Sequence, residues 1–121
     1  MNILEKIIAR KLEEVKTAKE STSIADLEKY ASFGRKTISV KENLLAKPFG
    51  IIAEHKRKSP SKGIINDKLS VEFITEGYSD AGASCLSILT DTDFFGGSKE
   101  DLIKARAANP NTAILRKDFI I

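Results

Sequence analysis

The sequence predicts an α/β fold in which a parallel β-sheet is covered by helices and preceded by a helical segment. Apolar runs of strand length occur at 51–56, 84–90 and 112–119, and amphipathic stretches of helical length separate them. Strands that alternate with helices form right-handed βαβ units, and such units build parallel sheets. We therefore divide the chain into an N-terminal helical extension, residues 1–47, and a strand-helix domain, residues 48–121.

The N-terminal extension is predicted to contain two or three helices. Apolar residues recur at helical spacing over residues 2–20 and charged residues fill the other face, which indicates an amphipathic helix. Ser23 with Asp26 matches a capping box for a second helix that extends to about residue 31. Ser39 with Glu42 repeats this signal and predicts one more short helix.

The strand-helix domain contains three predicted strands and two predicted helices. In chain order these are strand 51–56, helix 70–81, strand 84–90, helix 98–108 and strand 112–119. Gly82 stands where a glycine commonly ends a helix, and Ser98 with Asp101 marks the start of the next one. Three parallel strands leave two unpaired edges, so we interpret the chain as a fragment or as a domain completed by another copy or piece.

Composition and charge favour a single globular domain over several other classes. The 121 residues are 41% hydrophobic and 31% charged, and the net charge of +3 comes from interspersed residues, which does not indicate a nucleic-acid partner. The absence of an apolar leader and of a long apolar run predicts neither secretion nor membrane insertion. The single cysteine, Cys85, lies in an apolar run and is predicted to be a core residue, which fits a cytoplasmic location.

Charged side chains gather at the C-terminal ends of the first and third predicted strands. Side chains alternate along a strand, so Glu54 and Lys56 share one face while His55 points to the other, where we expect a neutral histidine under a helix. The same alternation places Lys117 at the end of the third strand. If the strands are neighbours in chain order, the first and third lie roughly 10 Å apart, and both lysines can reach one small anionic substrate.

Two predicted loops border these strand ends. Residues 57–63 add positive charge and hydroxyl groups suited to a phosphate or carboxylate. Residues 91–97 carry Phe94 and Phe95 beside two glycines, where a flat apolar group could dock, although Phe94 is better explained by packing. The pattern indicates a site for an anionic substrate with an aromatic part. A solvated basic loop and a structural ion pair are the simpler explanations of the same residues.

Three segments resemble the indole-3-glycerol phosphate synthase family: IIAEHKRKSPSKG at 51–63, LTDTDFFGGSKEDL at 89–102 and LRKDFII at 115–121. The resemblance implies a (β/α)8 TIM barrel, present as an N-terminal fragment with about three parallel strands. It also implies a carboxy-lyase of tryptophan biosynthesis. That enzyme closes the indole ring of 1-(2-carboxyphenylamino)-1-deoxyribulose 5-phosphate with loss of CO₂ and water. The resemblance implies no metal and no organic cofactor.

The same resemblance implies catalytic roles for three residues. Lys117 matches the family's general acid at the substrate carbonyl and hydroxyl. Lys56 matches the lysine that binds the substrate's anionic groups, and Glu54 matches its ion-pair partner. His55 occupies a position that is usually apolar in the family, and because it points away from this face we expect no effect on the chemistry.

Three further positions are implied to contact the substrate. Ser59 matches a residue that helps to position it, and Phe95 and Phe119 match aromatic residues that enclose its anthranilate ring. The family's general-base glutamate and main phosphate-binding loops belong to later strands, beyond Ile121. A full barrel takes about 250 residues. We therefore expect no activity from this chain alone, and self-association through its open sheet edge.

Two other functions stay open on the sequence alone. One is a different phosphate-binding barrel or a doubly wound receiver domain, but a receiver would need about five strands and acidic residues at the end of the first. The other is a non-catalytic module that binds anions or uses its sheet edge for interaction. Size-exclusion chromatography combined with an activity measurement would distinguish these functions, and efficient turnover by a purified monomer would contradict the fragment interpretation.

Overall fold

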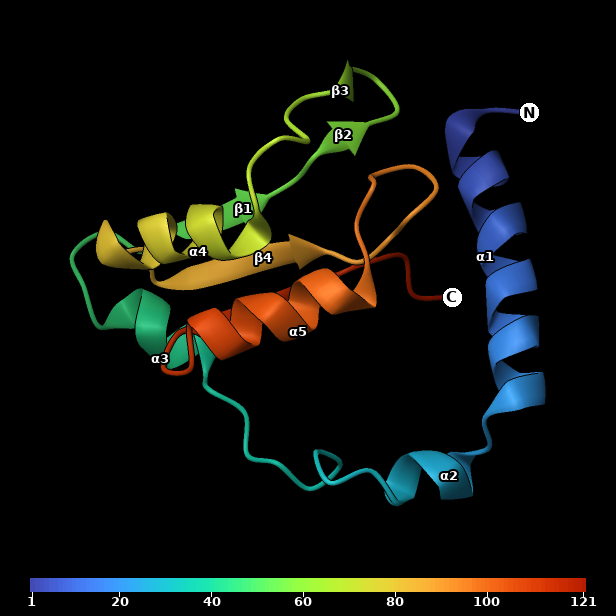
Figure 1. Ribbon diagram of the computed structural model, residues 1–121, viewed down its shortest axis with the longest axis horizontal. Helices are drawn as coiled ribbons and strands as arrows, with labels where there is room; N and C mark the ends of the chain where they lie inside the picture. Colours follow the sequence, from blue (N-terminus) through green and yellow to red (C-terminus); the bar gives the residue numbers. More distant parts are fainter. The chain divides into compact units, whose positions relative to one another are not determined.

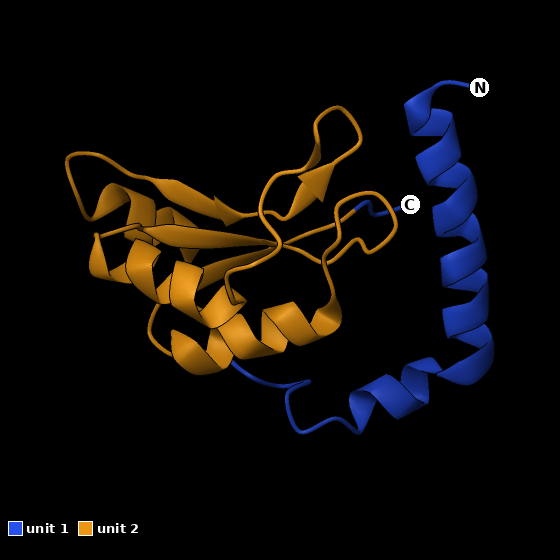
Figure 2. Ribbon diagram, turned by 45° about the horizontal axis from the view of Figure 1, so that its top comes forward, with its two compact units in different colours: residues 1–37, 119–121 blue, residues 38–118 orange.

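The computed structural model describes all residues from 1 to 121, and these form two compact units (Figure 2). Unit 1 contains Met1–Thr37 together with Phe119–Ile121, and unit 2 contains Ile38–Asp118. No helix of either unit combines the length and the apolar character needed to cross a membrane.

Unit 1 contains two of the predicted helices, α1 (Ile3–Ser21) and α2 (Ile24–Glu28). The predicted capping box of α2 is confirmed: the Ser23 hydroxyl accepts a hydrogen bond from the Asp26 amide, and Asp26 accepts one from the Ser23 amide. These backbone and side-chain hydrogen bonds lower the pKa of Asp26. α2 is shorter than predicted because the backbone after it changes to turns, in which Phe33 N–H donates to the Tyr30 carbonyl at 2.9 Å.

Unit 2 contains the predicted parallel sheet, with strands β1 (Ile52–His55), β4 (Cys85–Leu89) and β5 (Ala113–Lys117). The strand order is β1-β4-β5 and both pairings are parallel, so the prediction that the strands neighbour one another in chain order is confirmed (Figure 1). Each strand is slightly shorter than its apolar run. Because both pairings are parallel, the C-terminal ends of all three strands meet at one end of the sheet.

Helices α4 (Val71–Asp80) and α5 (Lys99–Ala108) pack against the sheet and against each other (Figure 1). The core between them is formed by Val71, Leu86, Ile88 and Ala105, all nearly or fully buried. The expected caps are present, and Gly82 follows α4 with a φ of 96°, the conformation expected of a glycine that ends a helix. Cys85 is buried, as predicted.

The segment 57–63 differs from the irregular loop expected. It contains most of a short antiparallel hairpin, β2 (Lys58–Ser59) and β3 (Gly63–Ile64), in which Ser59 pairs with Gly63. Gly63 has a φ of 64°, which a glycine adopts without steric cost. The hairpin leaves β1 at its C-terminal end and so belongs to the same end of the sheet as Glu54 (Figure 1).

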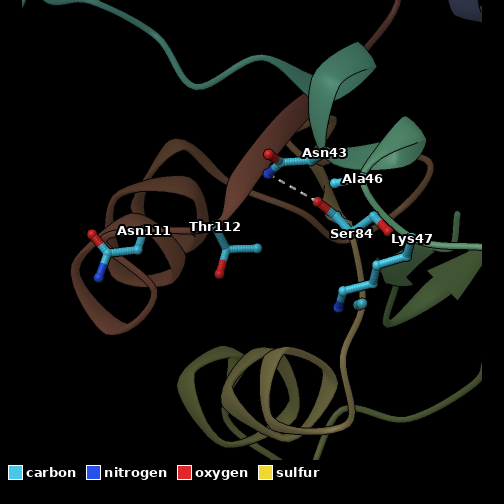
Figure 3. A pocket seen from close by; sticks show the side chains of 7 residues that line it. Asn43, Ala46, Lys47, Ser84, Asn111 and Thr112 are labelled. Atoms are coloured by element: carbon cyan, nitrogen blue, oxygen red, sulfur yellow. Dashed lines mark hydrogen bonds between the residues drawn. The ribbon is translucent and has the colours of Figure 1, made fainter.

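The N-terminal end of the sheet is covered by α3 (Val40–Leu45), which contacts β4 and β5. A cavity of about 210 Å³ lies between α3 and the segments that lead into these strands (Figure 3). In it the Asn43 amide donates to the Ser84 carbonyl at 3.3 Å, and Lys47 donates to the Gly82 carbonyl at 2.7 Å. Residues at this end of parallel strands generally serve stability.

Candidate active site

The C-terminal end of the sheet brings Glu54 and two lysines together on the face opposite to Ala53, which packs against the helix-covered core. Lys117 Nζ on β5 donates a hydrogen bond of 2.8 Å to Glu54 Oε1 on β1. Lys56 Nζ lies 3.5 Å from the other carboxylate oxygen, Oε2. The predicted convergence of the lysines is thus present, and one carboxylate holds both.

A third side chain, from the middle strand β4, also contacts the Glu54 carboxylate. Ser87 stands beside Glu54 in the β1-β4 register and beside Leu115 in the β4-β5 register. Its hydroxyl donates to Glu54 Oε1 at 3.1 Å. From the sequence, this serine was assigned only to a buried strand. Strand alternation places it on the face of Glu54, but only the register shows that the two side chains meet.

The ionised form of Glu54 is favoured in this environment. Partial burial opposes ionisation, but the hydrogen bond and charge of Lys117, the hydrogen bond from Ser87 and the charge of Lys56 outweigh it and lower the pKa of Glu54. The Lys117 side chain is 54% exposed and that of Lys56 33%. Two ammonium groups around one carboxylate leave a net positive charge, which suits an anionic ligand.

Asp91 organises the loop that follows β4. It is fully buried, and its Oδ2 accepts the backbone N–H groups of Phe94 at 2.8 Å and Phe95 at 3.1 Å. Gly97 closes the loop by donating to the Asp91 carbonyl at 2.7 Å. A Cβ atom at Gly97 would lie 2.0 Å from the Leu89 carbonyl oxygen, so only glycine fits there. The loop that carries Phe95 is therefore held in a defined shape.

Arg57 joins the segment after β1 to the loop that follows β4 and to the start of α5. Arg57 follows β1, and its guanidinium makes two contacts with the Asp101 carboxylate at the start of α5, one of them at 2.9 Å. The same guanidinium donates to the Gly96 carbonyl at 3.3 Å. The hydrogen bond to Asp101 raises the pKa of Arg57. We expected Arg57 to offer its charge to an anion, but that charge is neutralised by Asp101.

A sequence profile of indole-3-glycerol phosphate synthase matches residues 4–121. The chain belongs to this family. It is 47% identical over 122 residues to the indole-3-glycerol phosphate synthase of Bacteroides thetaiotaomicron, covering 99% of this chain and 46% of that protein. The corresponding enzyme of Bordetella pertussis is 42% identical over 125 residues, covering 99% and 47%. The chain thus spans about half the length of the curated relatives it matches.

Membership of the indole-3-glycerol phosphate synthase family confirms the predicted fold class. Its members are (β/α)8 barrels, and the three neighbouring parallel strands with α4 and α5 packed on them are the arrangement of successive βα units. In such barrels the active site lies at the C-terminal ends of the strands. Glu54, Lys56 and Lys117 meet at this end.

The three residues predicted to contact the substrate, Ser59, Phe95 and Phe119, lie in different surroundings. Ser59 is buried, and its hydroxyl accepts the Lys62 N–H at 3.2 Å, so its hydrogen bonding stabilises the hairpin turn. Phe95 is partly exposed on the loop fixed by Asp91. Phe119 belongs to unit 1, and its role in the site stays a prediction. No group of three or more side chains suited to hold a metal ion is present.

His55 points away from the two lysines, as predicted. It is 3% exposed, and Nε2 is buried without a hydrogen-bond partner. Burial and the nearby charge of Arg57 lower the pKa of His55, although Asp101 acts in the opposite direction. The ring is therefore neutral at pH 7, since its pKa lies below the ordinary value of 6.5.

We expect His55→Val to remove one pH dependence of stability. A lowered folded-state pKa means that the unfolded chain binds the proton more readily, so stability is complete above pH 6.5 and declines as the pH falls below it. His55 is the single histidine, so urea unfolding of the wild-type chain and the variant between about pH 5 and 7.5 isolates its contribution. An equal decline in both proteins would contradict this assignment.

Proposed function

We propose that this chain supplies the anion-binding side and the general acid of an indole-3-glycerol phosphate synthase. The reaction is ring closure of 1-(2-carboxyphenylamino)-1-deoxyribulose 5-phosphate with loss of CO₂ and water, a step of tryptophan biosynthesis. The observation that carries the proposal is that Glu54 holds Lys117 on one carboxylate oxygen and Lys56 on the other, at the C-terminal end of a parallel sheet.

Lys117 is the proposed proton donor. Ring closure forms a bond between the substrate's carbonyl carbon and the ring carbon that bears the carboxylate, so negative charge develops on the carbonyl oxygen. An ammonium group near that oxygen can donate its proton as the charge develops. CO₂ then leaves the ring carbon, and a proton supplied to the new hydroxyl lets it leave as water. A general base, which the family resemblance assigns to a later strand, removes a proton from the methylene carbon beside the nitrogen and so completes the indole ring. The hydrogen bond of 2.8 Å to Glu54 holds Lys117 Nζ in place.

Lys56 is the proposed contact for the substrate's anionic groups. Its charge lies at the same end of the sheet as the hairpin that carries Ser59. We propose that Ser59 helps to position the substrate. Phe95 and Phe119 are the proposed walls for the anthranilate ring, because an aromatic face suits a flat ring. The proposed reaction needs neither a metal nor an organic cofactor, and the proposed location is the cytoplasm.

Joining this chain to the remaining part of a full-length relative tests the function directly. We expect no ring closure by the 121-residue chain, and measurable turnover once it is fused to the part of the Bacteroides thetaiotaomicron relative that it does not cover. Below, this fusion is called the completed chain. Indole-3-glycerol phosphate formation is followed by fluorescence. Turnover by the chain as a monomer would contradict the need for completion, and an inactive but folded completed chain would contradict the function.

Self-association is the companion expectation for the chain alone. β1 and β5 are the two edges of the sheet, and each carries a row of backbone groups without a strand partner. Size-exclusion chromatography coupled to light scattering measures the oligomeric state. An interaction module would keep its assembly and its anion binding in both the 121-residue chain and the completed chain while producing no indole-3-glycerol phosphate.

A further inference from the structure

Ser87 links the middle strand of the sheet to the proposed catalytic group. It lies in β4, between Glu54 of β1 and Leu115 of β5, and is 2% exposed. Its hydroxyl donates to Glu54 Oε1 at 3.1 Å. An ionised carboxylate only accepts hydrogen bonds, so the serine must be the donor.

The two oxygens of Glu54 have separate tasks. Oε1 accepts from both Ser87 and Lys117, at 3.1 and 2.8 Å, whereas Oε2 faces Lys56 at 3.5 Å. Because Ser87 belongs to a buried strand, its hydroxyl group has little freedom to move. The two lysines are longer and more exposed, so neither can fix the orientation of the carboxylate as firmly as a buried hydroxyl.

We propose that Ser87 is a positioning residue of the ring-closing site, which fixes the Glu54 carboxylate so that Oε1 holds Lys117 and Oε2 stays with Lys56. This inference rests on the proposed function, in which Lys117 is the general acid. Ser87 fixes the Glu54 carboxylate, and the carboxylate in turn fixes the position of Lys117. Ser87 itself touches no reacting atom. Its effect is therefore expected on kcat more than on substrate binding.

Ser87→Ala in the completed chain should lower kcat by about tenfold and change KM by less than about twofold, because a hydrogen bond to a charged group is lost. Ser87→Thr keeps a hydroxyl at the same position and should recover most of the rate. The matched control is Ser84→Ala. Ser84 is also buried and precedes the same strand, but its hydroxyl accepts from the Ile51 amide at the other end of the sheet.

A titration separates this positioning role from simple structural support. Carbon-13 NMR of glutamate-labelled completed chain, with Glu54→Gln for assignment, gives the pKa of Glu54. The wild-type value should lie below the ordinary 4.5, rise in Ser87→Ala, and return in Ser87→Thr. Should Ser87→Ala not fold, Ser87→Cys replaces it, since a thiol of similar size is only a weak donor.

The outcomes are distinguishable. Equal losses of kcat in Ser84→Ala and Ser87→Ala, or a loss that Ser87→Thr does not recover, would overturn the proposal. So would an unchanged pKa of Glu54, or a changed pKa with an unchanged kcat. If the folded wild-type completed chain forms no indole-3-glycerol phosphate, the proposed function fails and the catalytic role of Ser87 fails with it. The titration would then still decide whether Ser87 fixes the carboxylate.

Discussion

Lys117→Ala in the completed chain is expected to reduce kcat for ring closure by about 1,000-fold. Positioned general acids contribute between about 100- and 10,000-fold, and this lysine is the one proposed to protonate both the carbonyl oxygen and the leaving hydroxyl. KM should change far less, because Lys56 still offers its charge to the substrate. Single-turnover and steady-state kinetics of the purified variant measure both quantities.

Two further variants make this expectation specific. Lys117→Arg keeps a positive charge near Glu54, but a guanidinium does not release its proton at neutral pH, so the rate should stay low. Lys99→Ala removes an exposed lysine from the start of α5 and should retain the wild-type rate. A Lys117→Arg enzyme with near-normal kcat would mean that this position supplies charge and not a proton.

The second large effect is expected on stability, from Asp101→Asn. The substitution leaves the Arg57 guanidinium without its carboxylate, but it preserves the backbone N–H that donates to the Ser98 hydroxyl at the helix cap. The Asp101 side chain is 8% exposed and that of Arg57 25%, so hydration of the guanidinium replaces only part of the lost interaction with the carboxylate. Breaking a buried ion pair from one side is costly, and we expect the free energy of unfolding to fall by about 2 to 3 kcal/mol.

Urea unfolding at pH 7 tests this expectation, with Glu100→Gln as the matched control. Glu100 is the neighbouring acidic residue in the first turn of α5, but it is exposed. Its replacement should cost well under about 1 kcal/mol, the usual effect of an exposed charge. Similar losses in the two variants would show that the favourable interaction is with the helix N-terminus and not with Arg57.

The order of helices and strands and the faces of Glu54, Lys56 and Lys117 could be predicted from the sequence. Both depend on local rules: helix caps are short-range hydrogen bonds, and side chains on a strand alternate. His55 was correctly assigned to the helix-covered side by the same rule. The hairpin was missed because its strands are only two residues each, too short to show any alternation.

Contacts between distant residues needed the tertiary structure. Lys117 and Glu54 are 63 positions apart, and Arg57 and Asp101 are 44 apart. The sequence showed a basic loop and a helix cap, but nothing in either segment indicated that Arg57 and Asp101 neutralise each other. The function of Asp91 in shaping its loop likewise depends on backbone N–H groups that turn toward it only after folding.

By itself, therefore, the sequence determined the family, the parallel α/β architecture and the three charged residues at the strand ends. Sequence motifs, helix caps and the alternation of side chains along a strand each depend on only a few neighbouring residues. Only the tertiary structure decided how those charges are held. Strand register sets which side chains face one another, so it alone revealed that one glutamate holds both lysines and that Ser87 shares its Oε1 with Lys117.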